Sequence, residues 1–439
     1  MSTTAAVRAA WAGVLLTVVL LLVGFGAPHW LDWAVAARAP RNASPHEVPP
    51  LHGLWRPKLF GPGTIPAVLM ALLGWRFAAE LADRLSWRRL LLASYAGSLA
   101  WLLSLALVDG SRGLSRSLGN PYEYLRTARE VGNVHTLLET YVDRIPYAAE
   151  DNWPTHVAGH PPGTLLFFVG LVKVGLGGDL AAGVVVTVLA ASTAAAVLVT
   201  LRALDAEEVA RRAAPFLVLT PAAVFMAVSA DALIAAVMAW GLACLALATR
   251  RLWWAVPAGL LMGYGVLMSY GMPLMGLVAL AVLVAARSWR PLPVAAGAAL
   301  AVVLLFAAGG FEWWDAYPVL RERYYDGIAQ DRPQSYWWYG DLACLVISAG
   351  PLLLPALAAA TRATRAARVP LLLVGATVVA IAIADVSGMS KAEVERIWLP
   401  FVPWLTVSFA LLPDGWRRWG LGAQVVAALV VQHLFYTVW

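Results

Sequence analysis

The stretch that decides the fold is Trp-Ala-Gly-Val-Leu-Leu-Thr-Val-Val-Leu-Leu-Leu-Val-Gly-Phe-Gly, which occupies residues 11–26. It contains no charged side chain, and Arg8 is the only one that precedes it. An α-helix needs about 20 apolar residues to cross the roughly 30 Å hydrocarbon core of a bilayer. Because no clear small-residue cleavage site follows, we predict a retained membrane anchor rather than a removed signal peptide.

The composition of the whole chain has the same character. Of its 439 residues, 61% are hydrophobic and 13% are charged, whereas about 25% of the residues in a soluble domain are charged. These values exclude a soluble globular enzyme, a disordered protein and a fibrous repeat. The net charge of +6 is typical of arginines at cytoplasmic helix ends, so no nucleic-acid partner is expected. Cys244 and Cys344 lie inside apolar runs, which predicts buried packing residues rather than a disulfide or metal site.

Apolar segments recur along the chain and predict a single all-α polytopic membrane domain over residues 1–439. Open sheet edges cannot cross lipid, and the segments are too long and continuous for barrel strands. The segments lie near 9–28, 60–80, 90–108, 163–177, 180–201, 213–229, 231–249, 253–270, 272–286, 291–310, 342–361, 369–386, 398–412 and 420–437.

The basic residues predict which side of the membrane each segment end faces. With every basic cluster in the cytoplasm, the chain alternates correctly except at 163–177, which is short and follows Pro161-Pro162. We therefore predict about thirteen full spans plus one partial or re-entrant helix, with a cytoplasmic N-terminus. The basic clusters are Arg8, Arg84/Arg88/Arg89, Arg202/Arg211/Arg212, Arg250/Arg251, Arg287/Arg290, Arg362/Arg365/Arg368 and Arg417/Arg418.

The segments of mixed polar chemistry then fall on the outer side of the cell membrane, so an active site is expected on the extracytoplasmic face. Two outer loops, 109–162 and 311–341, are long enough to carry interfacial helices. In the first loop, helical periodicity over 121–142 predicts one or two helices that start at Asn120-Pro121 and break at Gly132-Asn133.

Short motifs in these outer segments carry a family resemblance. The first loop reads Tyr-Glu-Tyr-Leu-Arg-Thr-Ala-Arg-Glu-Val at 122–131 and Gly-His-Pro-Pro-Gly at 159–163. Later come Ser-Ala-Asp-Ala at 229–232 and Glu-Val-Glu-Arg-Ile-Trp-Leu-Pro at 393–400. This pattern resembles the GT-C membrane glycosyltransferases, in which acidic residues precede a Tyr-containing helix and a Pro-Pro step follows. The last motif and the Trp-, Ala- and Arg-rich composition look like actinobacterial, cell-envelope members of that family.

The resemblance implies an inverting, single-displacement transfer of a sugar from a polyprenyl-phosphate donor to a cell-envelope glycan or glycolipid. Mannosyl, arabinofuranosyl and methylthiopentosyl transfer all stay open. The family's Asp-Glu pair is replaced here by Gly-Asn-Pro-Tyr at 119–122. Glu123 and Asp109 are therefore both candidates for the catalytic base.

The chemistry of an outer-face transferase leads to matching requirements. Nucleotide sugars are cytoplasmic, so the sugar has to arrive on a lipid phosphate embedded in the membrane. The protein then needs an apolar groove for the lipid tail, cations for the leaving phosphate and a carboxylate base for the acceptor hydroxyl.

Carboxylates for this purpose occur in the first outer loop and at one helix start. Glu123, Asp109 and Asp143 are base candidates, and the alternative interpretation of each is a solvated loop acid. Asp231 begins an apolar segment. It is either a supporting site residue or a first-turn acid that the helix dipole favours.

Cations that suit a donor phosphate lie in the same outer segments. Arg396 follows Glu393 and can bind a phosphate bidentately, unless it is an interfacial arginine paired with that glutamate. A divalent cation held by His156 and His160 is an alternative, but no third ligand has a convincing spacing. The phosphate- and substrate-binding candidates are Arg396, Lys391, Arg332, His160, Asp231, Glu393 and Tyr124.

The second outer loop is rich in tryptophan and tyrosine. Such residues form interfacial belts in membrane proteins. They can also form a carbohydrate platform, in which rings such as Trp337 stack on sugars while Asp326, Arg332 and Gln334 make hydrogen bonds. The tripeptide Asn-Ala-Ser at 42–44 also matches a glycosylation acceptor, a match that chance explains.

Two other classes of function compete with the enzyme. A transporter or flippase of a lipid-linked or polar envelope precursor should contain internal repeats and polar groups at mid-membrane. The sequence shows no such repeat, and Lys173 is the main ionisable residue inside an apolar segment. The third class is a scaffold subunit without chemistry.

Overall fold

The computed structural model describes residues 3–38 and 44–437, and helices make up most of the chain. Asn42 of the Asn-Ala-Ser tripeptide lies outside the described residues. The first elements are α1 (Thr3–Trp30), β1 (Gly53–Trp55), α2 (Thr64–Arg84), α3 (Trp87–Ala106) and the 3₁₀ turn η1 (Leu107–Asp109).

The first polar loop contains short helices, as its periodicity predicts. They are α4 (Arg112–Ser115), α5 (Tyr124–Glu130), α6 (Val134–Glu139) and α7 (Thr155–Ala158). The predicted break is confirmed, because Asn133 caps α6 by accepting a 2.8 Å hydrogen bond from the His135 N–H. The predicted helix start is wrong. The Asn120 side chain accepts from the Tyr122 N–H at 3.0 Å, which closes a turn, and the helix begins only at Tyr124.

The central part of the chain supplies most of the packed helices. They are α8 (Pro162–Lys173), α9 (Asp179–Ala191), α10 (Thr193–Ala203), α11 (Glu207–Val218), α12 (Ala223–Met226), α13 (Ala230–Ala248), η2 (Leu252–Trp254), α14 (Ala255–Val266), η3 (Met272–Leu274), α15 (Met275–Ala286) and α16 (Pro291–Ala308).

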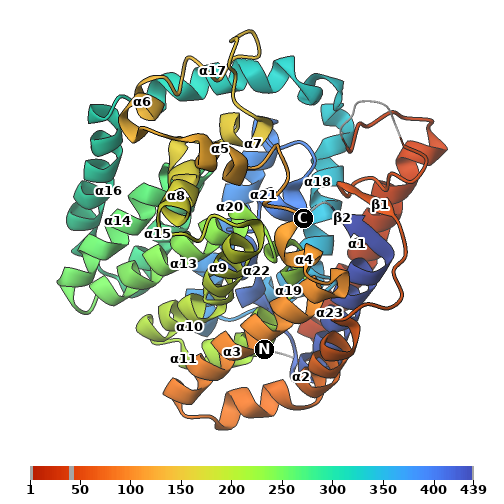
Figure 1. Cartoon of the computed structure of the whole chain (residues 1–439). Helices are drawn as coiled ribbons and strands as arrows, with labels where there is room; N and C mark the ends of the chain where they lie inside the picture. Colours follow the sequence, from red (N-terminus) through yellow and green to blue (C-terminus); the bar gives the residue numbers. More distant parts are fainter. Residues whose placement is uncertain (1–2, 39–43, 438–439) are drawn as a thin grey trace.

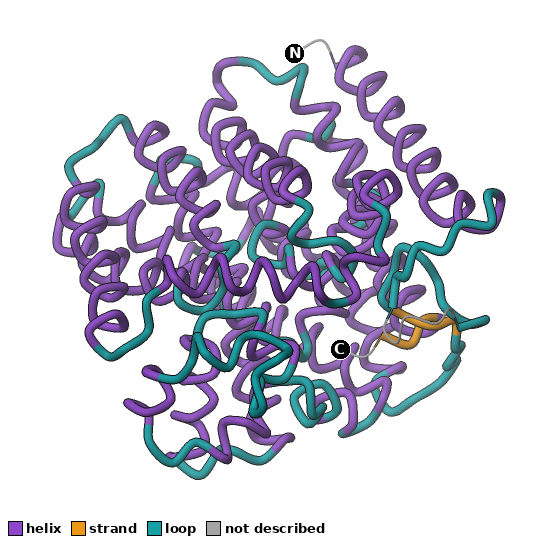
Figure 2. The backbone as a smooth tube through the Cα atoms, turned by 90° about the horizontal axis from the view of Figure 1, so that it is seen from above, coloured by secondary structure: helices purple, strands orange, loops and turns teal. Residues whose placement is uncertain are grey.

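The last part begins with a helix of the second polar loop, α17 (Trp313–Asp326), which crosses the upper edge of the molecule in Figure 1. The remaining elements are η4 (Ile328–Asp331), α18 (Gln334–Ala349), α19 (Leu353–Ala360), η5 (Arg365–Ala367), α20 (Arg368–Ser387), α21 (Val394–Ile397), α22 (Val402–Thr406), η6 (Val407–Leu411), α23 (Asp414–Leu434) and β2 (Phe435–Thr437). The two strands pair antiparallel, with Leu54 opposite Tyr436. Figure 2 shows this ribbon at the periphery of the helices.

Seven of the described helices are long and apolar enough to cross a membrane, so the chain is an all-α polytopic protein. They are Thr4–Trp30, Thr64–Arg84, Trp87–Asp109, Asp179–Ala203, Ala230–Ala248, Pro291–Ala308 and Arg368–Ser387. The segment predicted as one span over 342–361 is instead the pair α18 and α19, bent by 97°. The bend occurs at Gly350, whose φ of +94° is unfavourable for other residues, and at the proline that follows. Three other predicted spans are shorter apolar helices, Leu252–Val266, Met272–Ala286 and Val402–Leu411. The segment predicted as a partial helix, now α8, is also short.

Burial divides these helices into a centre and a rim. α13 is 83% buried, whereas α16 is 11% buried, and rim helices expose large apolar side chains such as Leu15, Leu69 and Leu305. Apolar side chains on the outside of a helical bundle suit contact with lipid tails rather than with water.

The arginine-rich turns pack against one another at one end of the bundle. Arg211 donates to the carbonyls of Ala82 and Leu85 at 2.8 and 2.9 Å. Arg250, just after α13, pairs with Asp205 at 2.6 Å. Asp231 occupies the opposite end of α13, and a helix of 19 residues is about 28 Å long. The basic turns and the polar loops are therefore separated by the length of a membrane-spanning helix.

Gly163 at the start of α8 offers a test of how tightly this arrangement is packed. A Cβ there would lie 2.4 Å from the Leu267 carbonyl oxygen, whereas a Cβ at Gly170 in the same helix meets nothing within 4 Å. Gly163→Ala should destabilise the protein by about 1–3 kcal/mol through overpacking. Gly170→Ala should stabilise it by about 0.5–1 kcal/mol. Thermal unfolding in detergent checks both, and equal melting temperatures for the two variants would contradict the close contact.

Candidate functional site

The site is built around Arg396, whose side chain is 3% exposed. This arginine lies on α21, which is a single helical turn. Nη1 donates to Glu123 Oε1 at 2.9 Å, and Nε lies 3.3 Å from Asp231 Oδ2. A guanidinium has five N–H donors in a rigid plane, so it joins the first polar loop and the start of α13 to α21.

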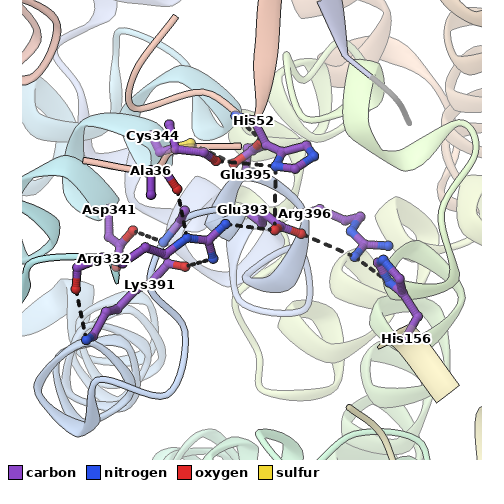
Figure 3. A network of polar contacts seen from close by, with 12 residues as sticks. Ala36, His52, His156, Arg332, Asp341, Cys344, Lys391, Glu393, Glu395 and Arg396 are labelled. Atoms are coloured by element: carbon purple, nitrogen blue, oxygen red, sulfur yellow. Dashed lines mark hydrogen bonds and ion pairs between the residues drawn. The ribbon is translucent and has the colours of Figure 1, made fainter. Parts of the chain in front are cut away.

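His156 is the third partner of this guanidinium (Figure 3). Arg396 Nη2 lies 2.9 Å from His156 Nδ1. Because a guanidinium can only donate, Nδ1 accepts and the ring proton is on Nε2. Burial, aided by Arg396, lowers the pKa of His156 to about 3, so the ring is neutral near pH 7. Its 3.4 Å approach to Glu123 is consequently a contact between two acceptors and not an ion pair.

His160 lies beside the same group with the opposite tautomer. Its Nδ1 is 3.0 Å from the His156 carbonyl, which only accepts, so Nδ1 carries the proton and Nε2 is an acceptor. Burial lowers the pKa of His160. Its ring meets Tyr124 edge-on at 5.8 Å, and Tyr124 in turn stacks on Phe168 at 5.7 Å. These packed rings fix the orientation of the imidazole.

Glu123 combines burial with an unused acceptor. Its backbone precedes α5, and the residue is 2% exposed. Burial raises the pKa of Glu123, and the positive charge of Arg396 opposes that rise. Oε1 accepts from Arg396, but among the described residues no donor reaches the buried Oε2. A buried carboxylate oxygen without a donor costs about 1–3 kcal/mol or more, so this atom marks a place for a proton donor from outside the chain.

Glu393 forms the more open edge of the group, with its side chain 20% exposed. Burial would raise the pKa of Glu393, but His52, Arg332 and Arg396 together lower it. Both Glu393 and the preceding Ala392 have positive φ, +63° and +62°. Non-glycine residues pay about 1–3 kcal/mol for such conformations, which cluster at functional sites. The Ala392 N–H donates to Asp341 Oδ1 at 2.9 Å and helps to hold this backbone.

Arg332 and Lys391 are not free to bind a phosphate as predicted. Arg332 donates to the carbonyls of Ala36 and Lys391 and pairs with Glu393 at 3.2 Å. Lys391 Nζ donates to the carbonyls of Ala329 and Arg332 at 3.2 and 3.0 Å. Both cations are buried and serve to fasten the polar loops together, because a buried charge needs every available partner.

His52 and Glu395 belong to the network but were not singled out in the sequence. The backbone N–H of His52 donates to Glu395 Oε1 at 3.1 Å, and the Cys344 thiol donates to Glu395 Oε2 at 2.8 Å. His52 Nδ1 lies 3.5 Å from Glu393, and burial lowers the pKa of His52 to about 4. A lone histidine in a long polar loop carries no local signal of this role. Glu395 is next to Arg396 in the motif at 393–400, so its position in that motif could have marked it as a candidate site residue.

Other sequence candidates lie apart from this group. Asp109 pairs with Lys58 at 3.0 Å and with Arg116 at 3.8 Å. Asp143 is exposed. Trp337 was predicted to stack on sugars, which is wrong for this structure: its ring is fully buried, and its N–H donates to the Val35 carbonyl at 3.0 Å. The residues that the structure brings together, hereafter the Arg396 cluster, are Glu123, His156, His160, Asp231, Glu393 and Arg396.

Within the described part of the chain, no group of three or more His, Cys, Asp or Glu side chains is arranged to hold a metal ion. No family model, no curated protein and no solved structure matches this chain. The chemistry of the Arg396 cluster is accordingly the basis for a proposal about function.

Removing the central charge should be far more damaging than removing a surface arginine. Arg396→Met leaves Glu123 and Asp231 buried without their counter-charge, at a cost of about 3–5 kcal/mol. Arg129 pairs with Asp179 near the surface, so Arg129→Met should cost about 0–1 kcal/mol. Thermal unfolding of the purified protein measures both.

The same experiment has a rescue arm. Adding Glu123→Gln and Asp231→Asn to Arg396→Met removes the orphaned charges and should recover much of the lost stability. If Arg396→Met melts at the same temperature as Arg129→Met, the buried guanidinium does not hold the cluster together.

Proposed function

We propose that the protein is a membrane glycosyltransferase of GT-C type. It transfers a sugar from a polyprenyl-phosphate donor to a cell-envelope glycan or glycolipid on the outer face of the membrane. The observation that carries this proposal is Glu123 Oε2, a buried carboxylate oxygen that no described donor reaches. A carboxylate that is fixed on one oxygen and open on the other suits a general base for a hydroxyl group.

The reaction that this base would serve balances without a cofactor. The acceptor hydroxyl gives its proton to Glu123 Oε2 while its oxygen bonds to the anomeric carbon of the donor. The bond between that carbon and the phosphate oxygen breaks, and its electron pair leaves with the polyprenyl phosphate. A positioned base contributes about 10²–10⁴-fold to such a step. Inversion at the anomeric carbon is the expectation that follows from the family resemblance.

Arg396 is the cation best placed for the departing phosphate. Its neighbours are the carboxylates of Glu123, Asp231 and Glu393, the last 3.9 Å from Nη2, together with the neutral His156 at Nη2. A phosphate oxygen is a stronger acceptor than an imidazole nitrogen. We expect the donor phosphate to replace His156 at Nη2, which keeps the base and the phosphate on adjacent nitrogens of one guanidinium.

A small apolar pocket of about 30 Å³ lies between α3, α9, α10, α11, α12 and α22. A polyprenyl tail is much larger, so this pocket could take only the edge of a tail that lies mainly along the outside of the helices. Two of its lining residues, Met226 and Leu399, are near Asp231 and Arg396 in the chain. Small apolar side chains such as Ala190, Ala194 and Ala223 form much of the wall, as expected of a site for hydrocarbon.

The location of the cluster favours an enzyme over a transporter. A transport path requires polar groups along the membrane interior. The Arg396 cluster lies instead among loops and helix starts at the end of α13 that is remote from the basic turns. The same arrangement supports the prediction that this end faces the outside and the arginine-rich turns face the cytoplasm.

Loss of the proposed base should abolish transfer. Glu123→Gln keeps the size of the side chain and should lower the rate by about 10²–10⁴-fold. Asp109→Asn removes the other sequence candidate and should leave most of the rate, because Asp109 pairs with Lys58 instead. The assay uses purified protein with radiolabelled polyprenyl-phosphate mannose or arabinofuranose and envelope extract as acceptor.

Mass spectrometry of envelope glycans from a deletion strain identifies the missing sugar. Full activity of Glu123→Gln, or an unchanged glycan profile, would contradict the proposal.

The rate should also depend on pH in a defined direction. Only the deprotonated carboxylate accepts a proton, and burial raises the pKa of Glu123 above its ordinary value of 4.5. The rate should therefore rise with pH through this raised pKa and level off above it. Rates measured from about pH 4 to pH 8 test the curve. The Asp109→Asn variant should show the same rise of rate with pH. A wild-type rate that falls as pH rises across this range would exclude a carboxylate base.

A further inference from the structure

Three aromatic side chains from two segments pack against one another. Tyr270 follows α14, whereas Trp313 and Tyr317 lie one turn apart on α17. The Trp313 and Tyr317 rings are parallel within 4° with centroids 5.5 Å apart, and Tyr270 is 5.6 and 5.8 Å from the two rings. All three side chains are half-buried, so the trio is neither core nor open surface.

Two polar atoms of this trio lack partners. Among the described residues, neither the Tyr270 hydroxyl nor the Trp313 Nε1 is hydrogen-bonded, although both atoms are buried. Each can donate a hydrogen bond. Buried donors left unpaired cost about 1–3 kcal/mol each, and two of them beside ring faces indicate a ligand that offers oxygen acceptors together with apolar C–H surface.

The trio is connected to the Arg396 cluster through packed backbone. The Tyr141 hydroxyl lies 2.8 Å from the Val157 carbonyl and 3.0 Å from the His160 carbonyl. The Tyr141 ring meets Phe311, which is two residues before Trp313, edge-on at 5.4 Å. The segment before Tyr270 is fastened to the start of α8, where Thr164 Oγ1 donates to the Met268 carbonyl at 2.9 Å. Phe311 and Tyr141 thus connect the trio to the backbone of His160, which belongs to the Arg396 cluster.

A hollow on α17 shares Tyr317 with the trio. It is lined by Tyr317, Pro318, Arg321, Glu322, Tyr325 and Asp326. The mixture of tyrosine rings with both signs of charge suits a polar ligand in water and not a hydrocarbon chain. α17 lies along the upper edge of the molecule in Figure 1.

We infer that Tyr270, Trp313 and Tyr317 form a binding subsite for one sugar ring of the acceptor glycan, and that further sugar units follow the hollow on α17. The ring faces would stack on the C–H face of the sugar, while the Tyr270 hydroxyl and the Trp313 N–H donate to its oxygens. Naming this ligand the acceptor rests on the proposed transferase function. The binding of a glycan by the trio does not.

The test measures glycan binding by the full-length protein in lipid nanodiscs, using an array of α-mannan, arabinan, galactan and glucan fragments. We expect the wild type to bind at least one of these, and Trp313→Ala and Tyr317→Ala to weaken that binding about tenfold or more. Tyr270→Phe removes only one hydroxyl and should weaken it by a smaller factor. This third variant protects the test against misfolding of the two alanine variants.

Trp314→Ala is the matched control. Trp314 is adjacent and 48% exposed, but its N–H already donates to Glu312 at 2.9 Å, so its loss should leave glycan binding unchanged. Glu123→Gln should fail to transfer sugar, which tests the base separately from the subsite. Failure of the wild type to bind any fragment, or equal binding by Trp313→Ala, Tyr317→Ala and the wild type, overturns the subsite. Retained transfer by Glu123→Gln would refute the base and leave the subsite standing.

Discussion

The structure depends on one guanidinium that is buried where three separate segments meet. An isolated charge in such a place costs several kcal/mol, and the cost is offset only by close, oriented counter-charges. Arg396 has these in Glu123 and Asp231, which come from a polar loop and from the start of the most buried candidate span. The pairing therefore determines how the loop sits on the helical bundle, and the geometry of the site follows from it.

The polar loops form one connected layer through further cations of the same kind. Arg323 of α17 donates to the carbonyls of Ile145 and Trp153 in the first loop, and Arg332 reaches the Ala36 carbonyl near the N-terminal segment. Arginine is suited to this role because its planar fork satisfies several acceptors at once. The layer covers helix ends and holds a carboxylate and two neutral histidines there.

Within that layer, unsatisfied atoms distinguish places for ligands from places that only support the fold. Arg332 and Lys391 have their donors occupied by backbone carbonyls, which makes them fasteners. Among the described residues, Glu123 Oε2 has no hydrogen-bond donor and the Tyr270 hydroxyl has no hydrogen-bond partner. Because buried polar groups in folded proteins are nearly always paired, these two atoms are where we propose that the acceptor hydroxyl and a sugar oxygen bind.

The sequence by itself determined the helical membrane fold, the break between α5 and α6, and the presence of Glu123, Asp231 and Arg396 in polar segments. These features depend on local hydrophobicity, turn residues and short motifs, which act between neighbours in the chain. Only the tertiary structure decided that Arg396 meets Glu123, a residue 273 positions away. It also buried Trp337, placed Asp109 with Lys58, and occupied the donors of Arg332 and Lys391. Such outcomes depend on which loops pack together, and this is set by the sum of many long-range contacts that no local pattern records.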